Sequence, residues 1–125
     1  MTQSALILFA HGARNASWAA PFERLRALTQ IRMPGVTVSL AYLELMTPRL
    51  PEMVAELAAA GVKKMTVVPV FLGQGGHLLR DLPRMLGQLQ TAFPDVQFDV
   101  VPAAGEAASV LNAIADYCVA AVAKM

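Results

Sequence analysis

The chain contains two histidines, and both follow an apolar run. His11 comes directly after residues 5–10, and His77 follows the run 67–72 and a short glycine-rich stretch. Neutral imidazole is a good ligand for divalent iron, cobalt, nickel and zinc. Because ligands of parallel α/β sheets bind at the carboxyl ends of the strands, two such histidines could share one crevice. The pair therefore suggests a metal site.

Glu44 is a third candidate ligand, because it ends the apolar stretch 36–43. A carboxylate adds negative charge to two imidazoles and leaves coordination positions open on the ion. No local motif ties the three residues together, however, since they lie far apart in the sequence. The structural alternative is that His11 caps a turn, that His77 starts a helix, and that Glu44 is an ordinary surface carboxylate.

Arginines beside these histidines could bind an anionic substrate. Arg14 follows His11, whereas Arg80 and Arg84 lie one helical turn apart just after His77. A guanidinium group can pair with a carboxylate through two parallel hydrogen bonds. The spacing of Arg80 and Arg84 is equally typical of a solvated helix face, so both interpretations stay open.

The glycine-rich stretch before His77 resembles a phosphate-binding loop in composition. Its glycines are Gly73, Gly75 and Gly76, but neither GxxxxGK[ST] nor GxGxxG is present. We therefore interpret Gly75 and Gly76 as positions where the loop moves or where a ligand approaches the backbone closely.

The composition predicts one globular domain over residues 1–125. The chain is 56% hydrophobic and 15% charged, with a formal net charge of +1. This balance argues against disorder and against a dedicated binder of nucleic acid or membrane surfaces. We find no signal peptide and no apolar run of membrane-spanning length. With a single cysteine, Cys118, the sequence favours a cytoplasmic protein, and its many apolar residues suggest a surface buried between subunits.

Short apolar segments alternate with helical patterns along the whole chain. The predicted strands are 5–10, 36–43, 64–72 and 96–101. The predicted helices are 18–32, a helix that starts at Thr47-Pro48 and stops at Gly61, then 79–89 and 106–123.

This βα alternation predicts an α/β fold with a parallel sheet and right-handed crossovers. We expect a flavodoxin-like, three-layer sandwich with a four-stranded sheet in the order 2-1-3-4. That order would place His11 and His77 on neighbouring strands, with Glu44 on the other side of His11. Periodicity alone leaves the strand order unproved.

Three segments carry a resemblance to a known family. They are Phe9-Ala10-His11-Gly12-Ala13-Arg14, then Ala41-Tyr42-Leu43-Glu44-Leu45 with Pro48, and Val67-Val68-Pro69-Val70-Phe71-Leu72 continuing through Gly75, His77, Asp81, Leu82 and Pro83. In this order and spacing, the chain resembles the small, single-domain sirohydrochlorin chelatases, which are class II cobaltochelatases and ferrochelatases.

The resemblance implies ATP-independent insertion of a divalent metal ion into sirohydrochlorin, for cobalamin or siroheme biosynthesis. Cobalt is favoured as the metal substrate, iron and nickel are possible, and no organic cofactor is expected. The resemblance assigns metal binding and catalysis to His11, Glu44 and His77. A neutral histidine could hold the ion and also accept a pyrrole proton.

The substrate and the longer relatives add two further expectations. Sirohydrochlorin carries eight carboxylates, so Arg14, Arg80 and Arg84 are candidate partners for its rim, with Gly75 and Gly76 beside them. Longer relatives contain two such lobes in one chain, which implies that a single-lobe chain forms a homodimer.

Two other functions are compatible with part of this sequence. In a histidine phosphatase, His11-Gly12 would belong to an Arg-His-Gly motif, but Ala10 stands where that motif needs its arginine. A non-enzymatic metal carrier or regulatory subunit on the same fold would keep both histidines without needing a tetrapyrrole cleft.

Overall fold

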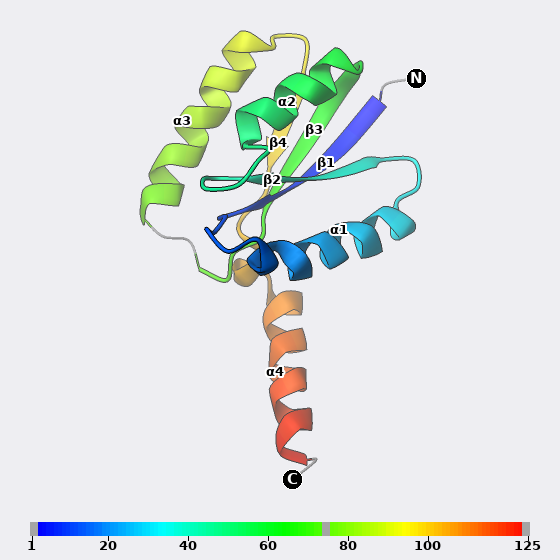
Figure 1. The fold of residues 1–125 in the computed structure, drawn as a ribbon, viewed down its shortest axis with the longest axis vertical. Coiled ribbons are helices and arrows are strands. Elements are labelled where there is room, and N and C mark those ends of the chain that lie inside the picture. Colours follow the sequence, from blue (N-terminus) through cyan, green and yellow to red (C-terminus); the bar gives the residue numbers. More distant parts are fainter. Residues whose placement is uncertain (1–2, 74–75, 124–125) are drawn as a thin grey trace.

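A computed structural model describes residues 3–73 and 76–123, with the backbone alone for residues 76–79 (Figure 1). One parallel sheet in the order β2-β1-β3-β4 forms the centre, with strands β1 (Gln3–Ala10), β2 (Thr37–Tyr42), β3 (Val62–Pro69) and β4 (Gln97–Val100). The helices are α1 (Ala20–Arg32), α2 (Leu50–Ala59), α3 (Gly76–Ala92) and α4 (Ala108–Ala123), with 3-10 turns η1 (Ala16–Ala19) and η2 (Ala104–Glu106). The predicted α/β class and strand order are confirmed.

Helices cover both faces of the sheet, as Figure 1 shows, with α2 and α3 on one face and α1 on the other. Strand β1 contributes to two hydrophobic cores, one on each face of the sheet, because its successive side chains point to opposite faces. Ile7 and Phe9 pack with the residues of α2 and α3, whereas Leu8 and Ala10 pack on the α1 side. All four are buried, which explains the continuous apolar run in the sequence.

Truncating the centre of this core should destabilise the protein strongly. Ile7 is fully buried, so Ile7→Ala leaves a cavity and should lower the free energy of unfolding by about 2–5 kcal/mol. Urea denaturation followed by circular dichroism measures this loss. The control Gln88→Ala, on the exposed side of α3, should stay within about 0.5 kcal/mol. Equal stability of Ile7→Ala and wild type would contradict the assignment of this core.

Helix α2 begins later than the sequence predicts. The prediction placed the start at Thr47-Pro48, but the helix runs from Leu50. The Tyr42 N–H donates a hydrogen bond to the carbonyl of Pro48 (2.9 Å), and Arg49 forms a parallel bridge with Tyr42. Pairing with the end of β2 therefore holds Pro48 and Arg49 outside the helix, which delays its start to Leu50.

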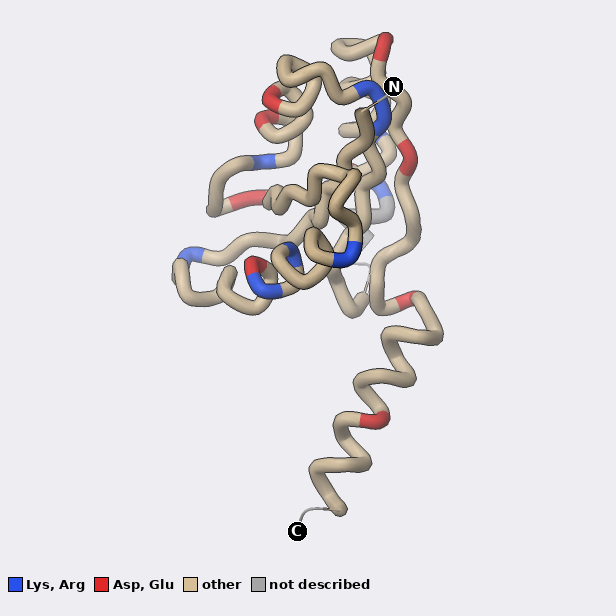
Figure 2. Tube along the Cα trace, turned by 90° about the vertical axis from the view of Figure 1, so that its right-hand side faces the viewer, with Lys and Arg blue, Asp and Glu red and all other residues tan. Residues whose placement is uncertain are grey.

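Helix α4 lies outside the layers. Figures 1 and 2 both show it extending away from the body of the molecule, and none of its residues from Ala108 to Ala123 is buried. The predicted helix is present, although it starts after 106, and no face of it packs on the sheet. None of the described helices, within residues 3–73 and 76–123, has the length and apolar character that crossing a membrane requires.

Candidate metal site at the carboxyl ends of the strands

His11 and Glu44 meet at the carboxyl ends of β1 and β2. His11 immediately follows β1, and its Nε2 atom lies 3.1 Å from Oε1 of Glu44. Both side chains are about half exposed, at 55% and 51%. The structure therefore brings together two of the three ligands that the sequence proposes, in a position open to solvent.

Backbone hydrogen bonds continue the β1–β2 pairing beyond the strands and hold this pair in register. The Leu43 N–H donates to the carbonyl of Ala10 (2.9 Å), and the Glu44 N–H donates to the carbonyl of His11 (3.1 Å). The next residue, Gly12, has φ +96° and lies so close that a Cβ there would sit 1.9 Å from the Glu44 carbonyl oxygen. Only glycine permits this backbone contact.

The chain reverses sharply directly after Glu44. Leu45 adopts a φ of 68°, and the Met46 N–H donates a hydrogen bond to the Glu44 carbonyl (2.8 Å). A leucine in the left-handed region is uncommon, and such backbone often occurs at functional sites. This turn fixes the position from which the Glu44 side chain leaves the backbone.

Phe71 adds an aromatic wall that the sequence analysis did not assign to the site. Its ring meets the His11 imidazole edge-on, with centroids 6.1 Å apart, and it meets Phe9 in the same way at 6.0 Å. Phe71 follows β3, so residues from the ends of three strands surround the imidazole. The sequence could have indicated Phe71 as a site residue, because Phe71 comes just after a buried strand, as His11 does.

The position of His77 is described only in part. Its backbone belongs to the first turn of α3, which begins at Gly76, while its side chain and Gly75 lie outside the described residues. Within residues 3–73 and 76–123, leaving aside the undescribed side chains, no group of three acidic, histidine or cysteine side chains gathers as a metal site. The His11–Glu44 pair is thus the described part of the proposed ligand set.

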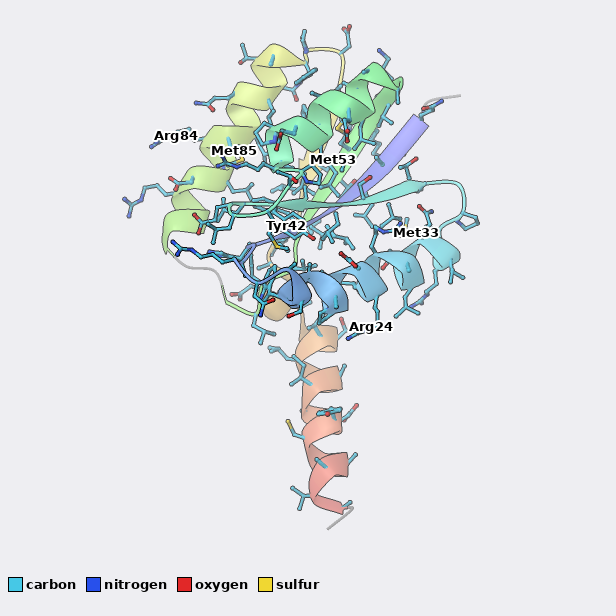
Figure 3. The ribbon with its side chains drawn as sticks, viewed as in Figure 1. Arg24, Met33, Tyr42, Met53, Arg84 and Met85 are labelled. Carbon is cyan, nitrogen blue, oxygen red and sulfur yellow. The ribbon has the colours of Figure 1, made fainter. Side chains whose placement is uncertain are left out.

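The three candidate arginines are exposed. Arg14 lies in the loop after β1, three positions beyond His11. Arg80 and Arg84 lie on the solvent side of α3, because helical spacing places them opposite the buried Leu82. Figure 3 shows Arg84 pointing outward from α3, away from the body of the molecule.

Tyr42, at the end of β2, is buried and stays neutral. Burial first, and the nearby Glu23 carboxylate second, raise the pKa of the Tyr42 phenol above its ordinary value. Because the phenol keeps its proton at neutral pH, it is no anionic ligand. The groups at this edge that could bind a divalent first-row ion are therefore the imidazole of His11 and the carboxylate of Glu44.

The chain is similar in sequence to curated sirohydrochlorin cobaltochelatases. The chain is 37% identical over 83 residues to the sirohydrochlorin cobaltochelatase of Methanopyrus kandleri, covering 66% of this chain and 58% of that protein. It is 34% identical over 86 residues to the sirohydrochlorin cobaltochelatase of Methanocaldococcus jannaschii, covering 69% and 60%. The chain thus matches about three fifths of the length of these curated relatives.

Solved structures share the fold. A CbiX protein from Marinobacter aquaeolei VT8, named for cobalamin (vitamin B12) biosynthesis, superposes with a TM-score of 0.87 at 31% identity, covering 98% of this chain and 99% of that one. The sirohydrochlorin chelatase SirB from Bacillus subtilis subspecies spizizenii, in complex with cobalt, gives 0.73 at 17% identity, covering 82% and 44%. The second likeness concerns the fold alone.

A match over nearly the whole chain supports the family assignment. The profile of the CbiX family matches residues 5–120, which include most of β1, all of β2, β3 and β4, and both residues of the described pair. The structure independently supplies the sheet order and the strand-end pair expected from the sequence. The chain belongs to the CbiX family.

Proposed function

We propose that this chain inserts a divalent metal ion into sirohydrochlorin without ATP and without an organic cofactor. The observation that carries the proposal is the His11–Glu44 pair at the strand ends of a CbiX-family chain. The named activity of the matched cobaltochelatases supports this substrate and favours Co²⁺, with Fe²⁺ or Ni²⁺ as alternatives. His77 would complete the ligand set, as the resemblance in sequence implies.

The proposed roles follow from the proton balance of the reaction. One divalent ion enters the ring, and the two pyrrole N–H groups lose their protons. His11 would bind the incoming ion or accept one of these protons, because imidazole has one lone pair for either task. Glu44, with Oε1 3.1 Å from Nε2 of His11, would stabilise the positive charge of the protonated imidazole. The second pyrrole proton would pass to solvent, which reaches both half-exposed side chains. Both groups are half exposed, so the ion can leave them for the ring.

Substrate binding is proposed for the basic and glycine positions near this edge. Arg14 is the candidate closest to His11 in the chain and is exposed. Arg80 and Arg84 would contact the outer carboxylates of the macrocycle, and Gly75 and Gly76 would let it approach the backbone. The outward direction of Arg84 favours a role at the rim of the substrate over a role near the metal (Figure 3).

We further propose that residues 1–125 act as one chelatase-like domain in a cytoplasmic homodimer. The resemblance to the chelatases implies longer relatives that contain two such lobes in one chain, and this chain matches less than half of the SirB chain, 44%. Two copies would supply two such lobes. The unpaired Cys118, exposed on α4, is compatible with a reducing compartment.

The direct test is the absorption spectrum of sirohydrochlorin under anaerobic conditions with Co²⁺, Fe²⁺ or Ni²⁺. We expect the purified protein to convert the free macrocycle to the metal complex faster than the spontaneous reaction, with no ATP present. Rates that equal the spontaneous rate for all three ions would overturn the proposal. Binding of Co²⁺ in equilibrium dialysis without insertion would identify the chain as a metal carrier.

A further inference from the structure

Helix α4 carries an apolar stripe that no other element covers within residues 3–73 and 76–123. Leu111, Ile114, Cys118 and Val122 follow helical spacing and therefore lie along one side of the helix. All of them are exposed, as are Tyr117 and Val119 beside them. An amphipathic helix owes most of its stability in water to burial of such a face. The stripe therefore requires a covering surface.

Helix α1 has an exposed apolar flank that also lacks a cover. Leu28 and Ile31 are 62% and 76% exposed, and Leu25 beside them is 38% exposed. The opposite flank of α1 is polar and faces β2: Gln30 donates a hydrogen bond to the Val36 carbonyl (2.7 Å) and accepts one from the β2 backbone. The apolar flank therefore faces the β3–β4 half of the sheet.

Among the described helices, none covers that half of the sheet on the α1 side. Met65, Val67 and Phe98 pack toward α2 and α3, so the alternate residues Val68 and Val101 face the other way. Val68 is half-buried and Val101 is 38% exposed. A parallel sheet is normally covered on both faces. The flank of α1 and this strip of β3 and β4 form one uncovered surface, which we call the open face.

We propose that α4 of one chain packs on the open face of a second copy, and that the second copy returns its own α4 to the first. The same chain carries the unpartnered stripe and the unpartnered surface, and a two-fold pair satisfies both at once. In Figures 1 and 2, α4 extends away from the sheet and from the rest of the described chain. This specifies the contact surface of the homodimer that forms part of the proposed function.

The size of α4 agrees with a second copy as the occupant. A helix of 16 residues is about 24 Å long and roughly 10 Å across. Two exchanged helices would bury on the order of 1,000 Å² or more, which is the range of specific interfaces.

A disulfide between different chains tests the exchange, and it needs no sirohydrochlorin, so it is independent of chelatase activity. One variant carries Leu28→Cys with Cys118→Ser, and the other chain keeps Cys118 alone. After the two are unfolded, mixed and refolded, mild oxidation should give a covalent heterodimer on non-reducing gels. The control Ala55→Cys with Cys118→Ser, on α2 at the far face of the sheet, should give at least about tenfold less.

The outcome separates three arrangements. A heterodimer specific to Leu28→Cys supports the exchange. A chain with both Cys118 and Leu28→Cys that closes its own disulfide as a monomer would show that α4 folds back on its own body, which overturns the proposal. Equal cross-linking of the Leu28 and Ala55 variants, or none with either, would also overturn it, because α4 would then have no preferred place on the open face.

Substitutions on α4 give a second measurement. Ile114→Asp puts a carboxylate in the stripe, and it should raise the dimer dissociation constant at least about tenfold in sedimentation experiments. Ala113→Asp adds the same charge on the opposite side of the helix and should leave the constant within about threefold. Circular dichroism confirms that both variants fold. A similar effect of the two substitutions, or no effect of Ile114→Asp, would contradict the proposal.

Discussion

His11→Ala is expected to lower the rate of metal insertion by about 100-fold or more, which is the scale of a lost general base. The variant removes the imidazole that contacts Glu44 and leaves that carboxylate without its partner. Because His11 is half exposed, its loss should change the free energy of unfolding by about 0.5 kcal/mol or less. The measurement is the initial rate of conversion of sirohydrochlorin with Co²⁺, together with a urea unfolding curve.

A matched pair of carboxylate variants separates the site from general charge effects. Glu44→Gln keeps the size of the side chain and removes its charge, so it should slow insertion by about tenfold or more. Glu56→Gln makes the same change at an exposed position of α2 and should leave the rate unchanged.

His77→Ala should lower the insertion rate as much as His11→Ala does if the resemblance to the chelatases holds. Full activity of His11→Ala would remove this pair from the mechanism.

Gly12→Ala is expected to destabilise the protein by roughly 3 kcal/mol or more and to disturb the site as well. Two costs combine at this position. An alanine at φ +96° is strained, and its Cβ would lie 1.9 Å from the Glu44 carbonyl oxygen, so the backbone has to shift. Because Glu44 belongs to the site, we also expect slower metal insertion. Urea denaturation and the insertion rate measure the two effects.

Two other glycines serve as controls that separate these costs. Gly61 has a similar φ of +94°, but its nearest neighbour is 3.9 Å away, so Gly61→Ala should cost only about 1–2 kcal/mol. Gly35 has neither a positive φ nor a close neighbour, and Gly35→Ala should stay within about 1 kcal/mol of wild type. If Gly12→Ala were no worse than Gly61→Ala, the contact with Glu44 would not constrain the backbone.

The sheet could be predicted from local patterns because burial on both faces leaves a clear signature. Residues 5–10 are all apolar, and the structure places them in the central strand β1. The positions of His11 and Glu44 could be predicted in the same way, because each residue comes directly after a segment with this strand signature. Their contact at 3.1 Å depends on β1 and β2 being neighbours, which the alternation of strands and helices favours without proving.

Features that depend on tertiary contacts could not be read from local patterns. Thr47-Pro48 has the chemistry of a helix start, yet the hydrogen bond from the Tyr42 N–H to the Pro48 carbonyl holds it outside the helix, which begins at Leu50. The stripe around Ile114 predicts a helix with a buried side, but spacing cannot name the surface that buries it. In the same way, the spacing of Arg80 and Arg84 fits a substrate rim and a solvated face equally well.

The placement of His11 and Glu44 on adjacent parallel strands has a consequence for the direction of ligand exchange. Neighbouring strands lie about 4.8 Å apart, and both donor groups leave the same edge of the sheet. An ion held by both groups would therefore have these protein donors on the side of the sheet, and both donor side chains are about half exposed to solvent. A planar ring with four inward-facing nitrogen atoms could then approach from the solvent side and receive the ion as His11 and Glu44 release it.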